Sequence, residues 1–136
     1  MEEQLAAEFG FPVIDIRGGA DRTMAGVIEQ LVVASGAPPV AVPLLVENGL
    51  WRDQLATTDL GHGVVLVRVR HPAVGVLGGV IGRCDPPVAW GAGAGRPIRV
   101  AVLVADPADA PAACLELLGR VARAVCRVTG RLGGGG

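Results

Sequence analysis

The stretch IRVAVLVAD (residues 98–106) decides the fold of this chain. Its side chains are nearly all apolar, so a strand formed here would bury both of its faces. Strands of this kind lie in the middle of a sheet that is covered on both sides. The stretch therefore predicts the central strand of an α/β domain.

Other stretches are expected to supply the rest of the sheet. Residues 63–69 (GVVLVRV) are rich in β-branched valine, and residues 73–82 (AVGVLGGVIG) form a strand that its glycines weaken. Residues 11–16 (FPVIDI) predict a short strand. Residues 51–63 are predicted to be a loop that could include a helical turn, and residues 85–97 are predicted to be a loop. The GAGAG stretch in the second loop has neither the strand before it nor the helix after it that a phosphate-binding loop needs.

A first helix is indicated over residues 24–32, where apolar side chains recur at helical spacing. Asp21 or Thr23 can cap its start, and Gly36 can close its end. The prolines that follow oppose a long helix, so only a short one is expected near residues 41–47.

The last helix has the clearest pattern. Asp109 is predicted to cap it, Pro111 suits its first turn, and Gly130 is expected to end it. Its apolar stripe consists of Cys114, Leu117, Leu118, Val121, Val125 and Val128.

These elements predict one α/β domain, with a central mixed sheet of about four to five strands flanked by helices on both faces. We expect residues 1–10 to be an N-terminal extension, residues 11–130 to be the domain, and residues 131–136 to be a flexible glycine-rich tail.

The composition narrows the class of protein. The 136 residues carry a formal net charge of −1, which argues against a nucleic-acid partner. No apolar run is long enough to span a bilayer, and the acidic N-terminus does not resemble a signal peptide. The three cysteines show no CxxC spacing and suit free thiols, so we expect a cytoplasmic protein.

Two histidines, His62 and His71, flank the strand at 63–69. Seven strand residues span about 23 Å, so the two imidazoles should be too far apart to share a metal ion. Taken singly, each is expected to be a loop histidine bonded to nearby backbone. No metal and no cofactor is expected.

Cys114 falls in the first turn of the last helix, where backbone amides can favour a thiolate. Its place on the apolar stripe instead favours a buried, small hydrophobic residue. Thr57, Thr58 and Asp59 could form a small hydroxyl cluster, although no catalytic triad has local support in the sequence.

Three ordered motifs resemble the enzyme IIA domain of the bacterial phosphotransferase system, of the fructose/mannitol and nitrogen-regulatory type. The family pattern RE-L-ST-GIG-GVAIPH is matched by RDQLATTDLGHGVVLVR (residues 52–68). A pattern like LGR…IDWGAPDGKPV is matched by VIGRCDPPVAWGAGAGRPI (80–98), and HL-LLARLAR by CLELLGRVAR (114–123). The likeness covers residues 11–129.

The resemblance implies a strand-end histidine that accepts a phosphoryl group from the phosphocarrier HPr or a relative. A second histidine, at the start of the late helix, helps to hold the phosphate. In this chain Arg68 occupies the acceptor position, Val67 replaces the proline before it, and Cys114 replaces the second histidine. Arg52 matches the family's arginine, while Asp53 stands in place of glutamate.

A guanidinium stays protonated and has no lone pair, so Arg68 cannot accept a phosphoryl group as imidazole does. It suits bidentate binding of phosphate or carboxylate. The leading hypothesis is a degenerate enzyme IIA-like domain that acts as a regulatory or protein-interaction module. Expected partners are a transporter, a kinase or a transcription regulator, or an HPr-like protein. The candidate anion-binding residues are Arg68, Arg52, Cys114, His71 and Thr58.

Three alternatives stay open. Arg68 could simply be a solvated residue at the end of its strand, with no ligand. The domain could be a working phosphocarrier that uses His71 or His62; His71 lies three residues beyond Arg68 and would face the other side of the sheet unless the chain bends at Val69 or Pro72. A redox sensor based on Cys114 is the third. Enzymatic activity is therefore undecided, and the loss of both histidines argues against it.

Overall fold

The predicted central strand is confirmed. In the computed structural model, which describes residues 1–18, 22–56, 58–91 and 95–133, five strands form one sheet in the order β1-β4-β5-β3-β2. Their bounds are β1 Val13–Asp15, β2 Thr58–Gly61, β3 Val64–Arg70, β4 Gly78–Trp90 and β5 Arg96–Asp106.

The sheet is mixed. β5 pairs antiparallel with β4 and parallel with β3, β1 adds to β4 in parallel, and β2 adds to β3 in antiparallel. Every residue of β5 from Val100 to Asp106 is buried. A central strand that is apolar on both sides therefore lies where its sequence requires.

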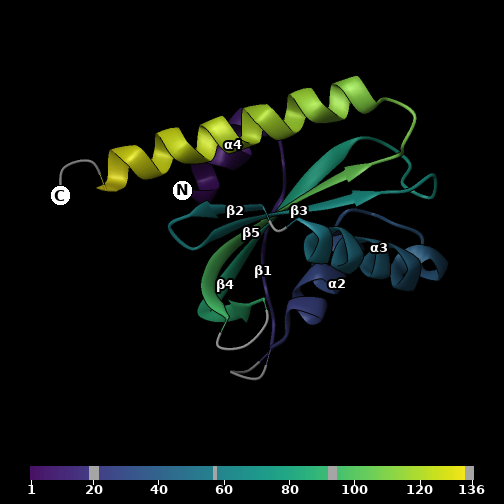
Figure 1. Ribbon diagram of the computed structural model, residues 1–136, viewed down its shortest axis with the longest axis horizontal. Coiled ribbons are helices and arrows are strands. Elements are labelled where there is room, and N and C mark those ends of the chain that lie inside the picture. Colours follow the sequence, from purple (N-terminus) through teal and green to yellow (C-terminus); the bar gives the residue numbers. More distant parts are fainter. Residues whose placement is uncertain (19–21, 57, 92–94, 134–136) are drawn as a thin grey trace.

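Helices cover both faces of this sheet (Figure 1). α2 (Met24–Ala34) and α3 (Val42–Leu55) lie on one face, while α4 (Pro111–Gly133) lies on the other together with α1 (Glu2–Phe9). The buried side chains form two hydrophobic clusters, one on each side of the sheet. The predicted fold class is confirmed.

The first predicted helix begins and ends as the sequence indicates. The Thr23 hydroxyl accepts a hydrogen bond from the Gly26 amide at 3.1 Å, and the chain leaves the helix through Gly36 at φ +85°. A side-chain oxygen at this position satisfies one of the unpaired first-turn amides. Asp21, the other candidate cap, lies outside the described residues.

The short helix over 41–47 and the loop over 51–63 are wrong. A 3₁₀ turn, η1 (Pro39–Ala41), leads into a helix that runs through Leu55, and β2 follows. Pro43 is tolerated because it lies in the first turn, where its missing amide hydrogen has no helical partner. Packing of Leu45 and Gly49 against the sheet then sustains the helix.

The loop over 85–97 is also wrong for most of its length. β4 continues to Trp90, with a register irregularity between Arg83 and Val88 where the two prolines fall. Trp90 is 1% exposed, and its Nε1 donates to Asp53 Oδ1 at 3.3 Å. Burial of this indole extends the strand. Residues 92–94 of GAGAG lie outside the described residues.

Both ends of the last helix differ from the prediction. α4 begins at Pro111, so Ala110, rather than Asp109, holds the position before it, and the Ala110 carbonyl accepts from the Cys114 amide. Gly130 does not end the helix, which continues to Gly133. One glycine disfavours a helix by only about 1 kcal/mol, less than neighbouring packing supplies.

α1 accounts for most of the ten residues that precede the predicted domain. Leu5 is 1% exposed and packs into the α4-side cluster, and Glu8 forms an ion pair with Arg127 at 2.7 Å. Within the described part of the chain, none of the helices combines the length and apolar character needed to cross a membrane.

Candidate functional site

The side chains of β3 alternate between the two faces of the sheet. Three valines at alternate positions pack into the cluster beneath α2 and α3: Val65, Val67 and Val69. Leu66 belongs to the α4-side cluster, and Arg68 and Arg70 continue its row. Among the described residues, β2 pairs with β3 only as far as Leu66, so no strand of the described chain covers the outer edge of β3 beside the two arginines.

A cavity of about 220 Å³ opens at this uncovered edge. Arg52, from the last turn of α3, lines it together with Arg68 and Thr58. The Arg52 Nε atom is buried and has no hydrogen-bond partner among the described residues. Neither Arg52 nor Arg68 has a carboxylate within ion-pair distance in the described part of the chain. Two guanidinium groups therefore share one cavity, which the buried carboxylate of Asp53 also lines; Asp53 Oδ1 accepts from Trp90 Nε1.

Arg70, in contrast, has its own counterion. Its Nε lies 3.4 Å from Oδ2 of Asp106, a carboxylate whose side chain is 2% exposed. The other Asp106 oxygen accepts from the Ala108 amide at 2.9 Å. The Arg70 amide donates to Asn48 Oδ1 at 3.0 Å and so connects β3 to α3. This network holds the end of β3 in place and does not include Arg68.

The charges near the cavity act on one another. Burial lowers the pKa of the Arg52 guanidinium from its usual range, and the nearby positive charges of Arg68 and Arg70 lower it further. Asp106 and Cys114 act in the opposite direction. Two arginines and one aspartate, Asp53, line the cavity, so the lining has a net positive charge. A bound anion would relieve the repulsion between the two guanidinium groups.

Cys114 faces the sheet from the first turn of α4 and is 5% exposed. Burial raises the pKa of its thiol, and a hydrogen bond with Asp106 raises it further. These effects outweigh the opposing influence of Arg68 and Arg70, so the residue is protonated at neutral pH. The position suits a small buried side chain and disfavours a reactive thiolate.

His71 follows β3 in a turn. Its Nδ1 accepts from the Ala73 amide at 3.0 Å, and its own amide donates to the Asp106 carbonyl. A neutral imidazole that accepts through Nδ1 carries its proton on Nε2, so this geometry leaves it no free lone pair. β3 keeps its register with β5 through Arg70, so no bend occurs at Val69. The chain does turn at Pro72, where the Val74 amide donates to the His71 carbonyl at 3.0 Å.

His62 lies at the other end of β3, in the turn after β2, with φ at +55°. Its side chain is exposed, and its carbonyl accepts from the Arg99 guanidinium at 2.8 Å. The structure thus separates the two histidines and brings together Arg52, Arg68 and Thr58. Among the residues that it describes, no three side chains of His, Cys, Asp or Glu gather as a metal site would require.

Sequence reasoning missed Arg70, Asp106 and Asn48. Arg70 repeats Arg68 two positions later, which is the strand period, and Asp106 ends the central strand. Those two signals were available, but their meeting depends on the parallel register of β3 with β5. Nothing in the sequence indicated Asn48.

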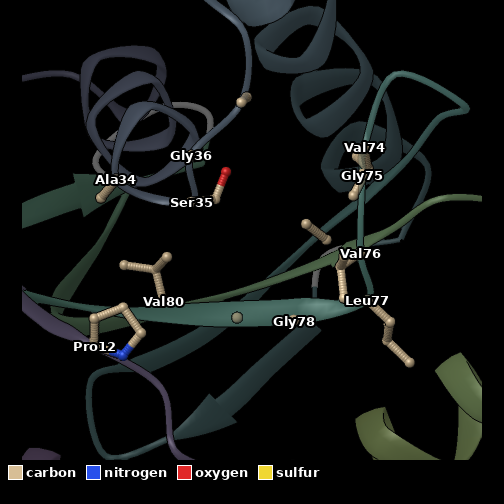
Figure 2. Close-up of a pocket in the computed structure, with 13 residues that line it drawn as sticks. Pro12, Ala34, Ser35, Gly36, Val74, Gly75, Val76, Leu77, Gly78 and Val80 are labelled. Carbon is tan, nitrogen blue, oxygen red and sulfur yellow. The ribbon is translucent and has the colours of Figure 1, made fainter.

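A second cavity, of about 350 Å³, lies elsewhere (Figure 2). It is bounded by the end of α2 at Ser35 and Gly36 and by the segment from Val74 to Val80. None of its lining residues is ionisable, and the Ser35 hydroxyl already donates to the Val32 carbonyl. It lacks the groups that acid–base or anion chemistry would need.

Comparison with known proteins confirms the resemblance expected from the motifs. No protein-family model matches the sequence. A "Nitrogen regulatory protein" of Bradyrhizobium diazoefficiens is 32% identical over 74 residues, which are 54% of this chain. The matched region spans about half (48%) of that relative's length.

Solved structures show the same fold. The nitrogen regulatory protein IIA-Ntr of Neisseria meningitidis superimposes with a TM-score of 0.66 at 25% identity, over 81% of this chain and 74% of that one. Enzyme IIA mannitol of Escherichia coli, solved in complex with phosphorylated enzyme IIB mannitol, gives 0.57 at 19% identity over 78% and 76%. A crystal structure of IIA mannitol from the same organism gives 0.56 at 20% over 78% and 77%.

Proposed function

We propose that this chain, which has the fold of the enzyme IIA domains, is a regulatory or protein-interaction module that binds an anion where its relatives accept a phosphoryl group. The names of the relatives support a regulatory role within the phosphotransferase system. One observation carries the anion: Arg52 and Arg68 line one cavity, and neither has a carboxylate partner in the described part of the chain.

The chemistry of position 68 separates this domain from a phosphocarrier. A carrier needs a neutral nucleophile near pH 7 that can later release the group, and imidazole meets both needs. Guanidinium offers only donors. It binds phosphate or carboxylate through two parallel hydrogen bonds, and a second arginine in the same cavity strengthens the attraction.

The neighbouring groups complete the proposed receptor. Thr58 lines the cavity and adds a hydroxyl donor. Two buried carboxylates lie near these arginines. Asp53 lines the cavity and accepts from Trp90 Nε1, and Asp106 forms an ion pair with Arg70. Neither carboxylate lies within ion-pair distance of Arg52 or Arg68 among the described residues. The anion belongs to a protein partner in this proposal, such as a transporter, a kinase, a transcription regulator or an HPr-like protein, or it is free phosphate.

Calorimetric titration with phosphate and with sulfate tests the receptor. The wild-type protein should release or absorb heat with one site per chain, and Arg68→Ala should abolish the signal. Arg17→Gln is the matched control, since Arg17 is exposed and follows β1 at the opposite edge of the sheet. Equal heats of titration for wild type and Arg68→Ala would show that Arg68 binds no anion and is a solvated residue at the end of its strand.

A further inference from the structure

α3 carries an exposed apolar stripe beside the arginine cavity. Leu44, Trp51 and Leu55 are 46%, 55% and 66% exposed, and Val40 in the preceding 3₁₀ turn is 90% exposed. Leu44, Asn48, Trp51 and Leu55 follow one another at intervals of four, three and four residues and therefore share one face of the helix. Large apolar side chains gathered on one exposed face mark interaction sites more often than scattered ones do.

Asn48 locates this face relative to the sheet. Its side chain accepts from the Arg70 amide, so the stripe runs alongside the uncovered edge of β3. Arg52 lies one turn beyond Asn48, and Leu55 lines the same cavity as Arg52 and Arg68. Apolar and cationic parts thus form one surface. We call it the α3 surface, made of Leu44, Trp51, Leu55, Arg52 and Arg68.

The composition of the α3 surface indicates the kind of partner that fits. Tryptophan and arginine are the residues most often responsible for binding energy at protein interfaces. The cavity lining carries two arginines against one aspartate, Asp53, and neither arginine has an ion-pair partner among the described residues. A negatively charged group on the partner would therefore complement this lining. Nothing at the second cavity (Figure 2) gives a comparable indication, since it has no charged residue.

We propose that the α3 surface binds an acidic amphipathic segment of a partner protein. Apolar side chains of that segment cover Leu44, Trp51 and Leu55, and one of its carboxylates enters the cavity between Arg52 and Arg68. The inference rests on the proposed function, because a carboxylate can enter only if the cavity is an open anion receptor.

Selection from a displayed library of random 16-residue peptides on the full chain tests this proposal. Enriched peptides should carry apolar residues three or four positions apart and at least one Asp or Glu. Synthetic copies should bind about tenfold more weakly to Trp51→Gln and to Arg68→Gln, as loss of an interface anchor usually costs. Replacement of the acidic peptide residue by its amide should have the same effect, and phosphoserine in its place shows whether a phosphoryl group is preferred.

Two controls separate this surface from others. Val76→Gln removes an apolar side chain that is 80% exposed in the segment before β4, and Arg17→Gln removes a distant charge, so both should keep binding within about twofold. Circular dichroism verifies that every variant is folded. The proposal would be overturned if no peptide is enriched, if the enriched peptides are basic, or if phosphoserine is preferred. It would also be overturned if binding is unchanged in Trp51→Gln and Arg68→Gln.

Sedimentation of the free protein adds one further outcome. A monomer is expected; a dimer that Trp51→Gln dissociates would mean that a second copy covers the α3 surface and would overturn the partner assignment. Phosphorylation of the wild-type domain by a phosphorylated HPr would instead refute the proposed function. The two failures are therefore distinguishable.

Discussion

Among single residues, Arg68 decides what the cavity can do. It keeps a positive charge at all physiological pH values, so its attraction for an anion should not depend on pH. An imidazole in the same place would be charged only below its pKa, near 6.5 in an unperturbed side chain. The two residues therefore predict different pH profiles for anion binding.

Arg68→His makes this difference measurable. Sulfate stays doubly charged between pH 5.5 and 8, so any pH dependence reports the protein. The variant should bind sulfate at least about tenfold more tightly at pH 5.5 than at pH 8, because imidazolium is lost as pH rises. Calorimetry of the wild-type protein over the same pH range should show a change in sulfate affinity below about twofold. A pH-dependent wild type would assign the anion to another group.

Cys84 supplies a second residue-scale prediction. Burial raises the pKa of its thiol to about 11. Because the folded pKa exceeds the unfolded value, the residue's contribution to stability is complete below about pH 9 and is lost as pH rises toward 11. Urea unfolding should lose on the order of 2 kcal/mol between pH 8.5 and 11.

Cys84→Ala is the control for that loss. The variant has no thiol at position 84 to ionise, so its unfolding free energy should fall less steeply over the same pH range. Cys126 is exposed, so Cys126→Ala is the matched substitution, and it should leave the pH dependence of the unfolding free energy as in the wild type. Equal slopes for wild type and Cys84→Ala would contradict the assignment.

The grouping of Arg52, Thr58 and Arg68 could be predicted from the sequence, because the resemblance assigns them to one candidate site and they line one cavity. The carboxylate that neutralises Arg70 could not, because Asp106 lies 36 positions away and reaches Arg70 only through strand pairing. Periodicity reports which face a side chain takes. It does not report which strand lies beside it.

At the scale of elements, α3 shows how tertiary packing overrides local preference. Three prolines argued against a long helix in this region, yet the helix spans 14 residues. Gly49 allows it to approach β3, since a Cβ there would lie 3.2 Å from Val69 and 3.3 Å from Ile28. β4 also continues past its prolines because burial of Trp90 stabilises its far end.

A pair of glycine substitutions tests that close approach. Gly49→Ala gains helix propensity but crowds Val69 and Ile28, which are both 1% exposed or less, and should destabilise the protein by about 1 kcal/mol. Gly130→Ala in α4 meets nothing within 4 Å and should stabilise it by about 0.5–1 kcal/mol. Urea unfolding measures both, and stabilisation by Gly49→Ala would contradict the packing described.

At the scale of the whole molecule, the sheet separates two cores. The strand pattern predicted this division, because an apolar central strand requires cover on both faces. The contribution of α1 was not predicted, since an eight-residue acidic helix is unstable alone and forms only against a partner surface. Leu5 provides that contact in the α4-side cluster.

Leu5→Ala tests whether α1 belongs to the folded unit. A side chain that is 1% exposed should cost about 2–4 kcal/mol when truncated. Leu115→Ala, at a position that is 63% exposed in α4, should change stability by less than about 0.5 kcal/mol. Chemical denaturation compares them, and equal small losses would show that α1 is not part of the cooperative structure.

The two faces of the sheet position different parts of the candidate site. The α2 side fixes α3 and its exposed stripe, while the α4 side closes over Cys114 and Asp106. The arginine cavity lies where the two meet, at the uncovered edge of β3. Arg68 is not part of either core, so the fold does not depend on which side chain occupies position 68.

Phosphoryl uptake tests the central claim most directly. The wild-type chain would be incubated with phosphorylated HPr and followed by phosphorus NMR, with an active enzyme IIA domain as the positive control. We predict no acid-labile phosphohistidine signal on the chain, because Arg68 has no lone pair and the Nδ1 of His71 is occupied by the Ala73 amide. A signal that disappears in His71→Ala or His62→Ala would contradict the account.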